Sequence, residues 1–198
     1  MSTYTARLRL ALWGLVGVAI IASVVLFVTR PGPVANGIGG GEYALVDDSG
    51  GKVDQTMLVG QPSLLFFGFT HCPDVCPTTL SEMAVWFDQL GSDAGNLRAF
   101  FVSIDPERDT PELMHGYVEF LGGRVTGITG TPTEIDKIAK AWRAFYENVP
   151  GANGDYTMNH SASVFLVNAE GGFEGTIAYQ EDPATAVAKI RKLLGKSA

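Results

Sequence analysis

A continuously apolar run at residues 63–69 and a second, largely apolar run at residues 97–104 constrain the fold of this chain more than any other feature. A strand without alternating polar residues is buried on both of its faces. Each run is followed by a segment whose apolar residues have helical spacing, 77–90 after the first run and 111–121 after the second. Buried strands that alternate with helices predict an α/β sandwich.

Further elements extend this pattern toward both ends of the domain. Strand–helix alternation that ends in a hairpin and a final helix is typical of a thioredoxin-like fold, which we expect for residues 42–198. The sequence predicts an edge strand at 42–47, a helix at 133–146, two strands at 162–167 and 173–179 joined by a glycine-containing turn, and a closing helix at 183–194.

The N-terminal residues predict a membrane anchor. Residues 10–29 carry no charge and are almost all apolar, and a helix of this length spans about 30 Å, the thickness of a bilayer core. A secretory signal peptide would have a shorter apolar stretch and a small-residue cleavage site, and the sequence has no convincing A-x-A site. We therefore expect residues 1–30 to form one uncleaved transmembrane anchor.

The charges around this run predict which side of the membrane carries the domain. Arg7 and Arg9 precede the run and no basic residue lies between Arg30 and Lys52, so the positive-inside rule places the N-terminus in the cytoplasm. Only nine residues precede the run, too few for a mitochondrial transit peptide, so we expect a bacterial inner membrane with a periplasmic domain. Residues 31–41 contain five glycines and two prolines, which predicts a flexible tether.

The charge of the domain argues against nucleic-acid binding. Residues 1–30 hold three of the 14 basic residues and none of the 21 acidic ones, so the rest of the chain has a net charge of −10. Such a surface repels nucleic acid and anionic lipid headgroups, and we expect no nucleic-acid partner.

Cys72 and Cys76 are the only cysteines of the chain, and they closely follow the first apolar run. A disulfide that closes so short a loop would add only about 2 kcal/mol, and two cysteines are too few for a disulfide framework. The pair is therefore expected to be reactive, either holding a soft metal ion or cycling between dithiol and disulfide. Pro77 suits the first position of a helix, which would place Cys76 at or next to the N-cap and lower the pKa of its thiol.

A third ligand would distinguish a metal site from a redox pair. Structural zinc needs four ligands, and two cysteines with three widely spaced histidines do not supply a typical set. His160 is the best candidate, because we expect residues 155–162 to form a polar loop that packs against the cysteine loop. Two thiolates and one imidazole suit Cu(I). Of the other candidates, we expect His71 beside the site or exposed, His115 on the surface and Met158 in packing.

The segment at residues 105–112 contains four carboxylates and one arginine. Paired carboxylates can perform acid–base catalysis, but nothing in the sequence pairs two acids across a cleft. We expect a capped loop instead, with Thr110 as the N-cap of a helix, Pro111 at its first position, and acids that favour its N-terminus.

Three motifs occur in a specific order: FTHCPDVCPTT at residues 69–79, SIDPERDTP at residues 103–111, and Tyr156 followed by His160-Ser161. In these motifs the chain resembles the SCO/SenC family of copper-binding assembly factors for cytochrome c oxidase. The single N-terminal membrane anchor also fits this family. One departure is Asn159, where the family often has an acid.

The resemblance, which covers residues 40–195, implies a thioredoxin-like fold and a bound copper ion. The implied ligands are Cys72, Cys76 and His160, and the ion is expected as Cu(I), with Cu(II) as the alternative. The resemblance also implies a periplasmic copper donor and delivery of the copper to the dinuclear copper centre of oxidase subunit II.

Other functions stay open. A thiol–disulfide oxidoreductase would use Cys72 and Cys76 to reduce the cysteines of the oxidase copper centre, although such pairs usually have C-x-x-C spacing. A peroxiredoxin-like peroxidase would need an arginine near its cysteine, and the cysteine segment has none. A copper or redox sensor acting through a membrane partner is a further alternative. We expect a copper-transfer protein rather than a turnover enzyme, because copper binding gives His160 a role.

Overall fold

The computed structural model describes residues 9, 12–23 and 37–196. The chain divides into two compact units, residues 1–33 and residues 34–198. Residues 12–23 of the first unit are helical. None of the helices in the described part has both the length and the apolar composition that a bilayer crossing requires. Residues 1–8, 10–11 and 24–30 of the predicted anchor and 31–36 of the predicted tether lie outside the described residues. The anchor and the tether therefore stay predictions.

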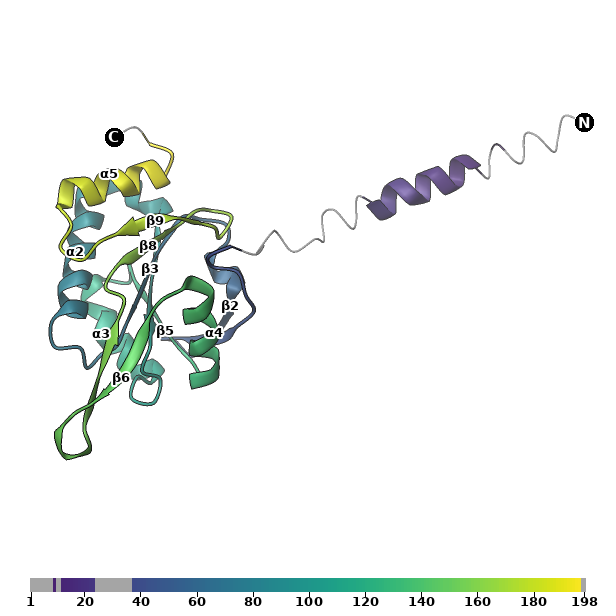
Figure 1. Ribbon diagram of the computed structural model, residues 1–198. Coiled ribbons are helices and arrows are strands. Elements are labelled where there is room, and N and C mark those ends of the chain that lie inside the picture. The colour runs from purple at the N-terminus through teal and green to yellow at the C-terminus, as the bar shows by residue number, and fades with distance from the viewer. Residues whose placement is uncertain (1–8, 10–11, 24–36, 197–198) are drawn as a thin grey trace, which may run out of the picture. The chain divides into compact units, whose positions relative to one another are not determined.

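A seven-stranded sheet forms the middle of the second unit, in the order β2-β1-β5-β4-β3-β8-β9 (Figure 1). Strands β3, β4 and β5 are parallel, and the remaining four strands join them in antiparallel pairs. The two predicted buried strands are β3 and β4, which lie side by side inside the sheet. The strands are β1 (Ala44–Asp47), β2 (Lys52–Asp54), β3 (Ser63–Gly68), β4 (Arg98–Ser103), β5 (Thr126–Thr129), β8 (Val164–Val167) and β9 (Phe173–Ile177).

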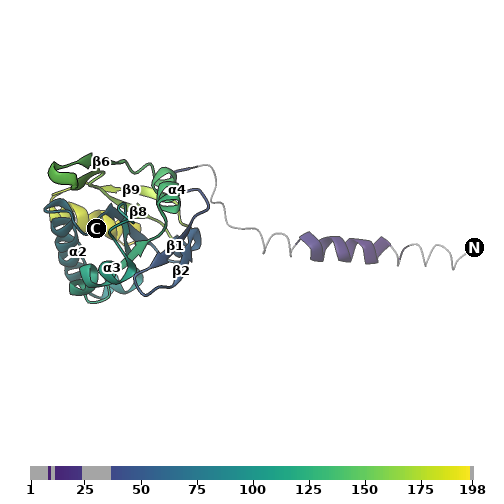
Figure 2. The same ribbon diagram turned by 90° about the horizontal axis from the view of Figure 1, so that it is seen from below.

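Helices cover both faces of this sheet, with α2 and α3 on one side and α4 on the other (Figures 1 and 2). The hydroxyls of Thr110 and Thr131 accept a backbone N–H in the first turn of α3 and α4, and a proline follows each cap. The helix predicted at residues 133–146 is α4, and the prediction that it reaches residue 146 was wrong. Arg143 adopts a left-handed conformation with φ 53° and ends α4. The helices are α2 (Val75–Leu90), α3 (Pro111–Val118), α4 (Pro132–Trp142) and α5 (Pro183–Leu193).

Packing on the two faces of β3 confirms that this strand is buried on both sides. On one face, aromatic rings stack from β3 through β4 to α3, with centroids 5.8 and 5.5 Å apart. On the other face, rings meet edge to face from β3 through β8 to α4, at 5.7 and 5.8 Å. The rings are Phe66, Phe101 and Tyr117 on the first face, and Phe67, Phe165 and Trp142 on the second.

A second, two-stranded sheet consists of β6 (Tyr146–Pro150) and β7 (Tyr156–His160). These strands form an antiparallel hairpin in which Tyr146 lies opposite His160. The prediction of a polar loop at residues 155–162 was therefore wrong for most of that segment. In β7, half-buried residues alternate with exposed ones, so the strand has one face toward the domain and one toward solvent.

Candidate metal centre

Cys72, Cys76 and His160 come from three different parts of the fold and meet in one place. Cys72 lies in the loop after β3, Cys76 in the first turn of α2, and His160 is the last residue of β7. One side-chain atom from each, the two Sγ atoms and an imidazole nitrogen, all lie within 4.8 Å of one another. The predicted approach of His160 to the cysteine loop is confirmed, although a strand rather than a loop carries it there.

The imidazole of His160 is oriented for ligation. Its Nδ1 lies 2.9 Å from the main-chain carbonyl oxygen of Ser161, and its Nε2 lies 3.5 Å from Sγ of Cys76. A carbonyl oxygen can only accept a hydrogen bond, so Nδ1 carries the proton and Nε2 keeps its lone pair. The rings of Phe66 and Phe69 pack edge to face against the imidazole, with centroids 6.1 and 5.9 Å away.

The two cysteines are free thiols in unequal surroundings, because Cys76 is buried and Cys72 only partly so. The thiol of Cys76 donates a hydrogen bond to the sulfur of Cys72, and the backbone N–H of Cys76 donates a second one at 3.4 Å. These bonds lower the pKa of Cys72 to about 4. The same bond to Cys72, together with burial, raises the pKa of Cys76 above its ordinary value.

The expectation that Cys76 would be the activated thiolate was therefore wrong. Helix α2 begins at Val75 with Asp74 as its N-cap, so Cys76 lies one residue inside the helix and Pro77 follows as the third residue. In this position the backbone N–H of Cys76 points at the sulfur of Cys72. The free N–H groups of the helix N-terminus thus favour the thiolate of Cys72.

Gly68 is a site residue that the sequence interpretation missed. A Cβ atom at this position would lie 2.6 Å from Sγ of Cys76 and 2.7 Å from a ring carbon of Phe101. The absence of a side chain therefore makes room for the sulfur against the end of β3. A glycine inside an otherwise bulky buried strand was the available signal, since such a glycine often marks a close approach.

The remaining candidates lie outside the three-residue cluster. The side chain of His71 is 50% exposed, and its Nδ1 lies 2.9 Å from the Thr70 hydroxyl. His115 lies on the surface of α3, as predicted. Met158 packs against the core, also as predicted, and Asn159 is exposed on the outer face of β7.

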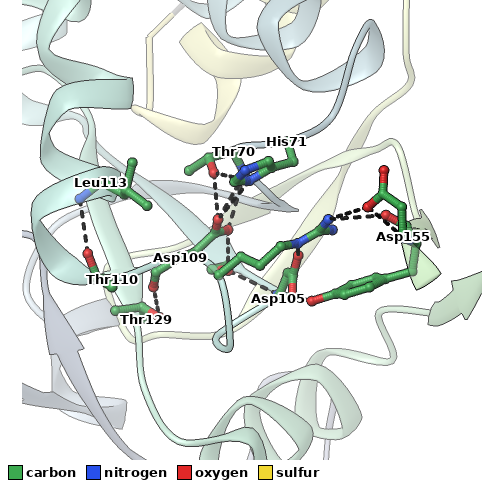
Figure 3. Close-up of polar contacts among 11 residues, drawn as sticks. Thr70, His71, Asp105, Asp109, Thr110, Leu113, Thr129 and Asp155 are labelled. Atoms are coloured by element: carbon green, nitrogen blue, oxygen red, sulfur yellow. Dashed lines mark hydrogen bonds and ion pairs between the residues drawn. The ribbon is translucent and has the colours of Figure 1, made fainter. Parts of the chain in front are cut away.

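The acidic segment behaves only partly as predicted. Thr110 caps α3, and Glu112 lies in its first turn. Asp105 and Asp109, however, are 3% and 0% exposed and make their bonds to other segments of the domain (Figure 3). Their interpretation as acids that favour the helix N-terminus was wrong.

Alkylation of the reduced full-length chain should reveal the inequality of the two thiols. Because the pKa of Cys72 is about 4, it is a thiolate at every pH from 5 to 8. Its reaction with iodoacetamide should keep a constant rate over that range, whereas an ordinary thiol speeds up about tenfold per pH unit below its pKa. Mass spectrometry of the two cysteine peptides would measure both rates, and Cys76 should react slowly.

The urea-unfolded chain provides the control for this experiment, because both thiols should then show the ordinary pH dependence. A Cys72 rate in the folded protein that rises about tenfold for each pH unit would contradict the assignment of the thiolate.

Comparison with known proteins adds a family relationship to this geometry. A sequence model described as SCO1/SenC matches residues 33–195. The human "Protein SCO1 homolog, mitochondrial" is 38% identical over 137 residues, which are 68% of this chain and 46% of that protein. The Arabidopsis thaliana "Protein SCO1 homolog 1, mitochondrial" is 37% identical over 135 residues, covering 68% of this chain and 40% of that protein. The chain thus spans less than half the length of these two relatives.

Solved structures share the fold of the domain. The Bradyrhizobium japonicum ScoI structure with copper bound superposes with a TM-score of 0.71 at 39% identity, covering 77% of this chain and 98% of that one. The yeast Sco1 structure with copper bound gives a TM-score of 0.72 at 30% identity, covering 80% and 89%. The predicted thioredoxin-like α/β fold is confirmed by these matches.

Proposed function

Since the chain belongs to the SCO1/SenC family, we propose that it is a copper-binding assembly factor of cytochrome c oxidase. In this proposal copper is the cargo of the protein, and Cys72, Cys76 and His160 bind it. The protein would act as a carrier rather than as a turnover enzyme.

The observation that carries this proposal is the arrangement of the three side chains. Two sulfurs and an imidazole nitrogen lie within 4.8 Å of one another, and the nitrogen lone pair faces the sulfur of Cys76. Two soft sulfur donors with one imidazole suit Cu(I), while the donor number is too low for structural zinc. The Cys72 thiolate is ready to bind, whereas Cys76 must give up its proton.

We further propose that the copper is delivered to the dinuclear copper centre of oxidase subunit II, after a periplasmic donor has supplied it. Residues 1–30 would anchor the protein in a bacterial inner membrane through the uncharged run at 10–29. Residues 31–41 would form the tether, and residues 42–198 the periplasmic domain. The match to SCO1/SenC supports the oxidase as the destination.

A second candidate function is reduction of the cysteines of that copper centre before the metal arrives. The pairing of a reactive thiolate at Cys72 with a second free thiol at Cys76 favours it, because thiol–disulfide exchange needs both. This function gives no role to the ordered lone pair of His160.

The His160→Ala variant separates the two functions. In a competition titration of the reduced full-length chain with Cu(I) and a chelator, the variant should bind at least about tenfold more weakly, a loss of about 1.4 kcal/mol or more. The reason is that the imidazole supplies one of three donors. The same variant should also lose the ability to load copper into reduced subunit II.

His115→Ala, on the exposed surface of α3, is the matched control and should bind like the wild type. Unchanged affinity in His160→Ala would contradict the three-ligand site. Undiminished reduction of oxidised subunit II by His160→Ala, together with failure to load copper by the wild type, would favour the reductase.

A further inference from the structure

We propose that the β4–α3 loop, defined as residues 105–109, positions the two halves of the metal site against each other. The inference rests on the proposed function only in taking Cys72, Cys76 and His160 as the ligands. Through Asp109 the loop holds the segment that leads to the cysteines, and through Asp105 and Arg108 it holds the hairpin that carries the histidine.

The need for such an element follows from the two sheets. The cysteines follow β3 of the seven-stranded sheet, whereas His160 ends β7, whose strand partner in the described part of the chain is β6. The hydrogen bonds within each sheet therefore do not set the separation of the imidazole from the sulfurs. Apart from the three residues that connect His160 to β8, side-chain contacts between the hairpin and the rest of the domain have to set this separation.

Asp109 fixes the cysteine side of the site. Its fully buried carboxylate accepts bonds from the backbone N–H and the hydroxyl of Thr70, at 3.1 and 2.6 Å, and from the hydroxyl of Ser103 at 2.6 Å (Figure 3). Thr70 lies two residues before Cys72, so these bonds determine where the cysteine loop leaves β3. A buried carboxylate holds its donors firmly, because a lost bond would leave part of its charge unsatisfied.

Asp105 and Arg108 fix the histidine side. The buried carboxylate of Asp105 accepts a hydrogen bond from the hydroxyl of Tyr156 at 2.7 Å and forms an ion pair with Arg108. Arg108 donates to the main-chain carbonyl of Tyr156 at 3.1 Å, and its guanidinium lies 3.7 Å from the centre of the Tyr156 ring. Because Tyr156 is the first residue of β7, these contacts fasten the strand whose last residue is His160.

Arg108 also reaches the imidazole through one intervening ring. Its guanidinium lies 5.9 Å from the centre of the Phe69 ring, and that ring packs edge to face on His160 at 5.9 Å. The exposed ion pair of Arg108 with Asp155, at 3.7 Å, adds little. At the base of the hairpin a further bond, from the Tyr146 hydroxyl to Asp136 at 2.6 Å, ties β6 to α4. The β4–α3 loop is therefore what holds the far end of β7.

The first test uses the full-length chain without copper. Arg108→Gln should accelerate amide hydrogen exchange in β7 about tenfold, because the strand opens more easily, and should leave β3 and β4 unchanged. Arg124→Gln is the matched control, since Arg124 also pairs with an aspartate and lies over a phenylalanine, but near the C-terminal end of α2 rather than on the hairpin. Equal exchange of β7 in Arg108→Gln and the wild type would overturn the proposal.

The second test asks whether Arg108 acts through His160. Arg108→Gln should weaken Cu(I) binding about tenfold, and adding it to His160→Ala should cause no further loss, because the ligand it positions is then absent. Independent, additive losses would overturn the positioning role. Arg108→Lys should recover only part of the affinity, since lysine keeps the charge but not the planar fork that stacks on Tyr156.

Tyr156→Phe covers the case in which Arg108→Gln does not fold. It removes only the hydroxyl bond to Asp105 and should still accelerate exchange in β7, by a smaller factor; no acceleration would count against the proposal. If the wild type fails to bind Cu(I), the proposed function fails, while hydrogen exchange still decides whether the loop holds the hairpin.

Discussion

The Cys72→Ser variant of the full-length chain is expected to bind Cu(I) at least about a thousandfold more weakly than the wild type, a loss of about 4 kcal/mol. Serine is close to cysteine in shape, but its hydroxyl is not a soft donor and stays protonated at neutral pH. The substitution removes the sulfur that is already charged at neutral pH, because its pKa is about 4. Competition titration of the reduced protein against a Cu(I) chelator would measure the loss.

Met158→Leu is the matched control for this variant. Met158 lies on the same face of β7 as His160 and carries a sulfur, and leucine has nearly the same volume. Its affinity for Cu(I) should be that of the wild type. Wild-type affinity in Cys72→Ser would refute the assignment of this ligand, and a comparable loss in Met158→Leu would show that the donor set is larger than three.

The Gly68→Ala variant is expected to lose both stability and copper affinity. The new Cβ would lie 2.6 Å from Sγ of Cys76, where ordinary contacts begin at 3.4 Å, so the sulfur and the neighbouring Phe101 ring must move. Overpacking of this kind destabilises a buried site by about 1–3 kcal/mol. Displacement of one ligand should weaken Cu(I) binding by about a hundredfold. Thermal unfolding of the apo-protein and Cu(I) titration would measure the two effects separately.

Gly116→Ala gives a control with the opposite sign. Gly116 lies in α3, and a Cβ there would meet nothing within 4 Å. Alanine favours a helix over glycine by about 0.5–1 kcal/mol, so this variant should be slightly more stable and should bind copper normally. A Gly68→Ala protein that unfolds and binds like the wild type would show that Cys76 does not depend on the missing side chain.

The parts of the fold that could be predicted are those with strong local signals. The apolar runs of β3 and β4 indicated buried strands, and the Thr-Pro pair at Thr110 marked the start of α3. Strands β2, β5, β6 and β7 have only three to five residues each and contain glycine, asparagine or aspartate. Their sequences resemble loops, and their pairing depends on partners that are distant along the chain.

The site was predictable in its members but not in its charges. Two cysteines and one histidine were identified from residue type and from the expected packing of the fold. The distribution of charge between Cys72 and Cys76 depends mainly on the hydrogen bond between their side chains and on the deeper burial of Cys76. Asp109 was missed because its bonds to Thr70 cross 39 residues of sequence.

The unequal burial of the two sulfurs leaves the site accessible from one side only. Cys76 is closed off by Gly68 and the core, so an approaching protein can reach the ligand set only on the side of Cys72 and His160, which are both partly exposed. In the proposed function, a copper donor and a copper acceptor that both use this route would have to bind at the same surface, one after the other. The two partners would then compete for one docking position. Copper loading and copper release would take place in two successive binary complexes rather than in one ternary complex.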